Sequence, residues 1–197
     1  MVAKQSALFD HILVSTDDKK IAEVSTLCGA EVPFLRPVEL SGDYIGMVEV
    51  IAHAVSWMYK QKWQPKTVCC MYATSVFLTV GDLKEGFNAL SIGNWSYVFS
   101  VTDFGYPIFR SFKKSFDGGV EMFFPEHFDK RSQDFPEALH DAAQFYWGKP
   151  DAWLNKLKIF EHHSFPIMIP RWKIQDIDTE DDWKRAELLF NTIHQKV

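Results

Sequence analysis

The sequence lacks a disulfide-forming set of cysteines, an excess of basic charge, and any long apolar run. Its three cysteines, Cys28, Cys69 and Cys70, are odd in number and two are adjacent, so they do not form a disulfide framework. The net charge of −5 argues against nucleic acid or an anionic membrane as a partner. No stretch approaches the roughly 20 apolar residues of a membrane span, and residues 1–9 lack the apolar segment of a signal peptide. These absences predict a cytoplasmic protein.

What is present is an alternation of apolar strands and amphipathic helices. The 197 residues suffice for a single domain that spans residues 1–197. Short apolar segments predict strands at residues 11–16, 31–34, 67–72, 95–101, 142–147 and 159–169. Apolar residues at helical spacing and helix-start signals predict helices over about 18–28, 45–61, 81–90 and from 179 onward. Since these strands are apolar on both faces, we expect an α/β fold with a mainly parallel sheet between two helical layers.

One segment, at about residues 104–128, departs from this alternation. It is dense in aromatic residues and places Asp117-Gly118-Gly119 between two strand-like runs. This pattern predicts a β-hairpin extension. Exposed aromatic side chains on such a hairpin indicate a dimer contact, and a lid over a site remains the alternative.

Two aspartates, Asp176 and Asp178, follow the last apolar segment and precede the final helix. Residues i and i+2 of an extended segment point the same way, so these carboxylates would project together. Mg²⁺ prefers one or two carboxylates completed by substrate phosphates and water. The alternative is an acidic helix start, since Thr179 and Asp182 form a Thr-x-x-Asp cap. The helix start explains Glu180, Asp181 and Asp182 but not the earlier pair, and the spacing alone leaves both interpretations open.

A second group of polar residues lies among aromatic residues between positions 131 and 146. It comprises Arg131, Gln133, Asp134, His140, Asp141, Gln144 and Tyr146. A polyhydroxylated sugar needs fixed donors and acceptors beside flat apolar faces. A solvated loop would have a similar composition, so the residues alone also leave this question open.

Several motifs, in order along the chain, resemble the acylneuraminate cytidylyltransferases. The first run from Phe9 to Asp18 is Phe-Asp-His-Ile-Leu-Val-Ser-Thr-Asp-Asp, and Gly29 to Pro37 reads Gly-Ala-Glu-Val-Pro-Phe-Leu-Arg-Pro. Later motifs look most like the CMP-pseudaminic acid synthetase branch: Tyr72-Ala73-Thr74-Ser75, Gln133-Asp134-Phe135-Pro136-Glu137-Ala138, the run 140–148 and Gln175-Asp176-Ile177-Asp178-Thr179. The similarity covers nearly the whole chain from Phe9 onward.

The resemblance implies a Rossmann-like nucleotidyltransferase fold and the transfer of CMP from CTP to an acidic nine-carbon ketosugar, with release of pyrophosphate. It implies a homodimer that serves surface or flagellin glycan synthesis. It also implies Mg²⁺ at Asp176 and Asp178, the catalytic pair, and a nucleotide contact at Arg36 and Asp43. The residues that it implies for the sugar are Tyr72, Thr74, Arg131, Gln133, Asp141, Gln144 and Tyr146, with Arg131 a candidate partner for the sugar carboxylate.

The sequence departs from the family pattern at its start. The family begins with a strand and an Arg-Gly-Gly-Ser-Lys-type loop for the CTP phosphates, and nothing upstream of Phe9 matches either. We therefore expect this chain to lack that nucleotide-binding segment, whose backbone N–H groups and lysine hold a triphosphate. Two alternatives to an active transferase follow: an inactive, truncated homologue that acts as a binding or dimerising module, and a glycosyltransferase-like enzyme whose Asp-x-Asp pair holds a sugar nucleotide.

Overall fold

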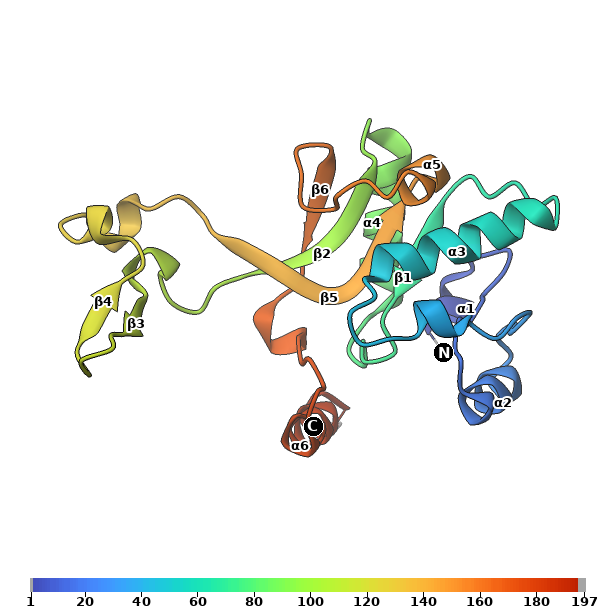
Figure 1. Cartoon of the computed structure of the whole chain (residues 1–197), viewed down its shortest axis with the longest axis horizontal. Helices are drawn as coiled ribbons and strands as arrows, with labels where there is room; N and C mark the ends of the chain where they lie inside the picture. Colours follow the sequence, from blue (N-terminus) through green and yellow to red (C-terminus); the bar gives the residue numbers. More distant parts are fainter. Residues whose placement is uncertain (1, 195–197) are drawn as a thin grey trace.

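The computed structural model describes residues 2–194 and is built around one four-stranded sheet (Figure 1). The strands lie in the order β1-β5-β2-β6. Their bounds are β1 Val68–Met71, β2 Tyr97–Asp103, β5 Leu139–Gly148 and β6 Ser164–Met168. The helices are α1 Val2–Ser6, α2 Lys19–Leu27, α3 Met47–Lys60, α4 Val80–Ile92, α5 Pro150–Leu154 and α6 Glu180–His194. No helix of the described residues has both the length and the apolar character that crossing a bilayer requires.

The expected mainly parallel sheet is wrong for this part of the fold. β5 runs antiparallel to both of its neighbours, β1 and β2, and only the β2–β6 pair is parallel. The chain leaves the sheet after β2, passes through the extension and returns as β5, so β5 re-enters from the opposite direction (Figure 1). Apolar strands on both faces predicted a covered sheet correctly, but that pattern does not distinguish strand direction.

Two hydrophobic cores lie on the two faces of the sheet, as a three-layer arrangement requires. Side chains of β2 point alternately to the two faces of the sheet. Tyr97, Phe99 and Val101 belong to one core, and Val98 belongs to the other. The first core is closed by α3 and α5, which contact each other. The second is closed by α4, against which α1 packs. The helical layers on both faces therefore agree with the prediction.

The two predicted N-terminal strands, residues 11–16 and 31–34, do not form a ladder. They meet at one parallel bridge between Leu13 and Glu31, with the Val14 N–H donating to the Glu31 carbonyl at 2.9 Å. The apolar residues that suggested buried strands are only half-buried here. A single bridge keeps the two segments side by side without extending the sheet.

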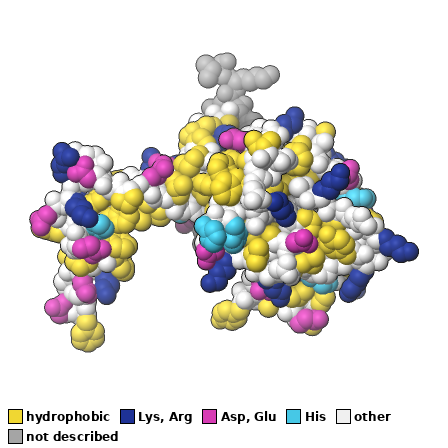
Figure 2. All heavy atoms as spheres, turned by 90° about the horizontal axis from the view of Figure 1, so that it is seen from above, with side chains coloured by type: hydrophobic (Ala, Val, Ile, Leu, Met, Phe, Trp, Pro, Cys, Tyr) yellow, Lys and Arg dark blue, Asp and Glu magenta, His cyan; other side chains and the backbone are white. Residues whose placement is uncertain are grey.

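The extension projects far from the sheet between β2 and β5 (Figure 1). It contains the hairpin formed by β3 Phe112–Lys114 and β4 Val120–Met122, followed by the short 3-10 helices η3 Pro125–His127 and η4 Ser132–Asp134. A small aromatic cluster holds its base, with ring centroids 5.0–5.5 Å apart between Phe109 and its neighbours. Other aromatic side chains, such as Phe116 and Phe128, stay exposed, and hydrophobic groups are visible along its surface (Figure 2).

Candidate active site

A cavity of about 430 Å³ opens beside the sheet, between α3, β5 and the segment that precedes β6. Apolar side chains from Met47, Val48, Ile159 and Phe160 form part of its lining. The polar part of the lining consists of Tyr72, Asp141, Tyr146 and Lys158. A few polar groups against apolar walls are typical of small-molecule sites.

A wide bulge in β5 shapes this cavity. Phe99 pairs with Tyr146 and Val101 pairs with Asp141. Between these pairs β2 contributes only Ser100, whereas β5 contributes residues 142–145. Bulges of this kind re-aim side chains next to functional sites. Here the bulge brings the side chain of Asp141 back to that of Tyr146, five residues later.

Hydroxyl groups on both sides hold the bulge. The buried Ser100 Oγ accepts the backbone N–H of Gln144 at 3.1 Å and that of Phe145 at 3.2 Å. From the loop after β1, Ser75 Oγ donates to the Gln144 carbonyl at 2.8 Å. Ala143 at the centre has a φ of +50°, a left-handed conformation that is rare for a residue with a Cβ. The buried N–H groups of Gln144 and Phe145 therefore depend on Ser100 for their acceptor.

Asp141 and Tyr146 form the polar centre of the cavity. Asp141 Oδ1 accepts the Ala143 N–H at 3.0 Å, and Asp141 Oδ2 accepts the Tyr146 hydroxyl. Burial and this hydrogen bond to Asp141 raise the pKa of Tyr146 far above its usual range. Burial also raises the pKa of Tyr72, whose ring lies 5.5 Å from that of Tyr146. Both phenols therefore remain protonated donors at neutral pH.

The structure brings Asp176 close to this cluster. The negative charges of Asp141 and Asp176 add to the burial that raises the pKa of Tyr72. Asp176 and Asp178 are exposed in the segment between the 3-10 helix η5 Arg171–Lys173 and α6. Among residues 2–194, neither carboxylate forms an ion pair with a basic side chain, so both are available to a ligand.

The donor set at Asp176 and Asp178 fits a hard cation only in part. No cluster of three or more histidine, cysteine or acidic side chains suited to a metal occurs in the described part of the chain. Two carboxylates are nevertheless what Mg²⁺ takes from a protein when phosphates and water complete its shell. The magnesium assignment therefore remains a prediction with which the residues present are compatible.

The segment that carries the two aspartates is fixed at several points. The Lys173 ammonium pairs with Asp82 of α4 at 3.5 Å, and both side chains are largely buried. The buried Gln175 side chain donates to the Asp176 carbonyl at 2.7 Å and to Asp182 at 3.3 Å. These contacts anchor the segment on both sides of Asp176.

The helix-cap interpretation holds for Asp182 alone. The Thr179 N–H donates to Asp182 Oδ2 at 3.0 Å, and the Asp182 N–H donates to Thr179 Oγ1 at 3.2 Å. The hydrogen bonds from Thr179 lower the pKa of Asp182. The cap thus accounts for one acidic side chain and leaves Asp176 and Asp178 outside it.

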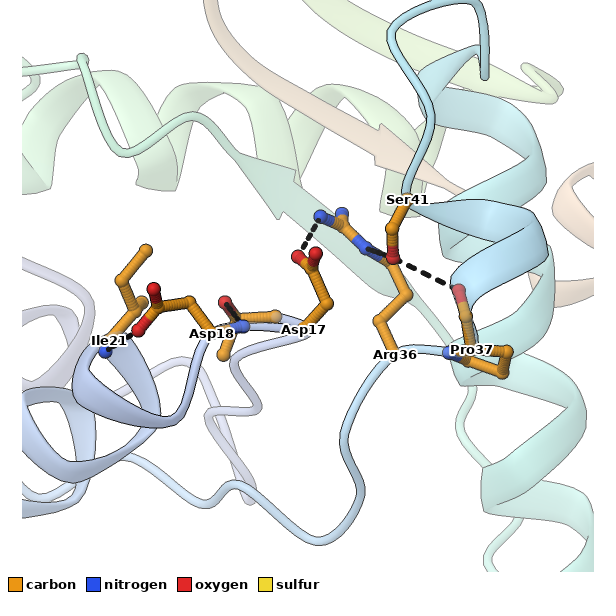
Figure 3. Close-up of polar contacts among 7 residues, drawn as sticks. Asp17, Asp18, Ile21, Arg36, Pro37 and Ser41 are labelled. Atoms are coloured by element: carbon orange, nitrogen blue, oxygen red, sulfur yellow. Dashed lines mark hydrogen bonds and ion pairs between the residues drawn. The ribbon is translucent and has the colours of Figure 1, made fainter.

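The structure places the predicted nucleotide contact Arg36 in a polar cluster around the start of α2 (Figure 3). Its guanidinium donates to Asp17 at 3.1 Å and to Ser41 Oγ at 3.3 Å. The adjacent Asp18 caps α2 by accepting two backbone N–H groups. Arg36 therefore has an acidic partner within the chain, while Asp43 lies in the exposed turn before α3.

The residues predicted for the sugar separate into two groups. Tyr72, Asp141 and Tyr146 line the cavity, Thr74 lies in the turn after β1, and Gln144 is only 3% exposed within the bulge. Arg131 and Gln133 lie at η4 on the extension and are not among the residues that line the cavity. Arg131 there makes a two-bond contact with Asp134, at 2.8 and 3.0 Å.

Sequence reasoning missed three residues that the geometry brings to the site. Ser75 and Ser100 hold the bulge, and Lys158 lines the cavity. Ser75 ends the motif Tyr72-Ala73-Thr74-Ser75, which resembles the family, and this resemblance is the signal that could have identified it. Ser100 lies in an apolar strand and Lys158 in a basic run, and neither pattern indicates a site.

The fold is that of the Rossmann-like α/β nucleotidyltransferases. A solved structure with this fold is the CMP:2-keto-3-deoxy-manno-octonic acid synthetase complexed with CTP. It superposes with a TM-score of 0.67 at 10% identity, over 97% of this chain and 85% of that one. At this identity the likeness establishes the fold alone.

The chain belongs to the cytidylyltransferase family, whose profile matches residues 1–107. A pseudaminic acid cytidylyltransferase of Campylobacter jejuni is 37% identical over 98% of this chain and 83% of its own length. A Helicobacter pylori protein named pseudaminic acid cytidylyltransferase and UDP-2,4-diacetamido-2,4,6-trideoxy-beta-L-altropyranose hydrolase is 32% identical, over 89% of this chain and 34% of that protein. The predicted family is confirmed, and a glycosyltransferase-like enzyme is not supported.

Proposed function

We propose that this protein transfers CMP from CTP to an acidic nine-carbon ketosugar of the pseudaminic acid type and releases pyrophosphate. The observation that carries the proposal is the joint placement of Tyr72, Asp141 and Tyr146 at one cavity, with the charge of Asp176 acting on Tyr72, in a chain of the cytidylyltransferase family. The similarity to pseudaminic acid cytidylyltransferases supports the choice of sugar.

In the proposed reaction the anomeric hydroxyl of the sugar attacks the α-phosphate of CTP, and the bond from that phosphorus to the pyrophosphate oxygen breaks. Such transfers depend mainly on positioning and on neutralising developing charge. Asp141 accepts hydrogen bonds from sugar hydroxyl or amide groups, and the protonated phenol of Tyr72 donates one. Asp176 and Asp178 would hold Mg²⁺, which when bound neutralises charge on the phosphates.

Two further features belong to the proposal. The exposed aromatic side chains of the extension, such as Phe116, Phe123 and Phe128, support a homodimer that buries them, because large exposed apolar patches mark interaction sites. A monomeric state in light scattering at micromolar concentration would contradict this. The cysteine usage and the nucleotide substrate support a cytoplasmic enzyme.

The test uses the full chain with CTP, pseudaminic acid and Mg²⁺, and measures pyrophosphate release. Asp178→Ala should reduce turnover to below about 1% of wild type, since loss of a charge-stabilising group costs about a hundredfold or more. Asp181→Ala is the matched control: it removes an exposed acid of the same helix start that pairs only with Lys184, and its activity should be unchanged. Circular dichroism checks that both variants are folded.

Absence of turnover by the wild-type chain with any nonulosonic acid would refute the enzymatic proposal. If the same chain still forms a dimer, the binding or dimerising module becomes the better description. Equal activity of Asp178→Ala and Asp181→Ala would leave the transferase in place and remove Asp178 from its site.

A further inference from the structure

Lys158 is the cationic residue in the lining of the cavity, and its backbone is fixed. The Tyr97 hydroxyl donates to the carbonyl of Leu157 at 3.2 Å, and a ring nitrogen of His163 lies 2.9 Å from the carbonyl of Lys158. Tyr97 is fully buried in the central strand. The sheet therefore sets the position from which the Lys158 side chain reaches the cavity.

The Lys158 ammonium has no acidic partner among the described residues. Asp141 lines the same cavity, and each of its oxygens accepts one hydrogen bond, from the Ala143 N–H or the Tyr146 hydroxyl, which leaves each a second lone pair for a ligand. The cavity thus has a positive group and a separate acceptor group on its rim, over apolar walls. A ligand that fits both needs an anionic group together with neutral donors.

An acidic ketosugar has this combination, since it carries one carboxylate together with hydroxyl and amide groups. The resemblance suggested Arg131 as the partner of that carboxylate. In this structure the Nε–Nη2 edge of Arg131 contacts Asp134, and the pair lies at η4 on the extension. The cavity itself therefore offers Lys158 in its place.

We propose that Lys158 binds the carboxylate of the acidic sugar and thereby selects acidic over neutral sugars, an inference that rests on the proposed function. The sugar's carboxylate lies toward the Lys158 side of the cavity, and its neutral polar groups lie toward Asp141. An anion at Lys158 could also be a phosphate of CTP, so the experiment must follow the two ligands separately.

The experiment compares Lys158→Met with the control Lys156→Met. The control removes the same charge from a position two residues earlier, whose side chain is not part of the cavity lining. Calorimetry measures the Kd of pseudaminic acid and, separately, of CTP for each full-length variant. A hydrogen bond to a charged group is worth about tenfold to a hundredfold in Kd. We expect Lys158→Met to weaken pseudaminic acid by that factor, with CTP unchanged, and Lys156→Met to match wild type for both.

The carboxamide of pseudaminic acid supplies the decisive comparison. Wild type should bind it as weakly as Lys158→Met binds the acid, and Lys158→Met should not discriminate between acid and amide. If Lys158→Met binds the acid as wild type does, or weakens CTP instead, the inference is overturned while the transferase stands. If wild type binds no nonulosonic acid, the inference falls together with the proposed function.

Discussion

Replacing Ser100 with alanine tests whether one buried hydroxyl maintains the bulge on which the cavity depends. Ser100 is 0% exposed, and its Oγ accepts two backbone N–H groups of β5 at 3.1 and 3.2 Å. Alanine removes a single oxygen and keeps the backbone geometry of β2. The two N–H groups, from Gln144 and Phe145, then lose their acceptor inside the sheet.

The expected magnitude follows from those two donors. Each buried donor left without a partner costs about 1–3 kcal/mol, so the pair costs about 2–6 kcal/mol if the bulge keeps its shape. That is a large share of the roughly 5–15 kcal/mol that stabilises an ordinary domain. A bulge that relaxes instead recovers part of this free energy, but it then moves Asp141 and Tyr146 away from each other.

Urea unfolding and steady-state kinetics together distinguish these outcomes. If the bulge stays rigid, the free energy of unfolding should fall by the full amount. If the bulge relaxes, the free energy of unfolding should fall by less, the KM for the sugar should rise, and the KM for CTP should not change. Ser91→Ala is the control, because that exposed hydroxyl only donates to the Phe87 carbonyl within α4, and its effect should stay within about 0.5 kcal/mol. If Ser100→Ala matches this control in both stability and KM, the hydroxyl does not hold the bulge.

Two other predictions concern the core. Gly86→Ala in α4 would place a Cβ 2.6 Å from the ring of Phe145, so urea unfolding should show that the free energy of unfolding falls by about 1–3 kcal/mol. The control is Gly81→Ala in the same helix, whose Cβ would meet its nearest atom at 3.6 Å and should not destabilise the protein. Burial raises the pKa of Tyr97 from its ordinary value of 10.0 to about 12, so the unfolded chain releases this proton first and stability falls as pH rises through that interval. Tyr97→Phe should therefore lose less stability than wild type between pH 10.0 and about pH 12, and equal losses would contradict the assignment.

The fold could be predicted from the sequence where local patterns decide it. The apolar run at residues 67–72 became β1, the run at residues 95–101 became β2, and Asp117-Gly118-Gly119 joins the two strands of the hairpin. In each case hydrophobic spacing or turn chemistry acts over a few neighbouring residues. Strand direction was not predictable in this way, because β5 is antiparallel only as a result of the path that the chain takes through the extension.

The cavity depends on contacts between distant residues, so its polar residues could be named but not placed. Asp141 and Tyr146 are brought together by a bulge that Ser100 maintains from another strand, 45 positions away from Phe145. Arg131 is near Asp141 in sequence, yet it is the N-cap residue of η4 on the extension, whereas Asp141 lies in β5 at the cavity. Proximity in sequence therefore grouped side chains that the extension separates.

The acidic run from Asp176 to Asp182 shows how local and tertiary requirements divide among similar residues. Asp182 is explained by its two reciprocal hydrogen bonds with Thr179, which any helix start with this sequence would form. Asp176 gains nothing comparable from the helix, and instead adds negative charge beside Tyr72 at the cavity. That charge disfavours the Tyr72 phenolate and leaves the neutral phenol as a donor. Asp176 and Asp178 are exposed and form no ion pair among residues 2–194. They are therefore the carboxylates that a hard cation could use when substrate phosphates complete its shell.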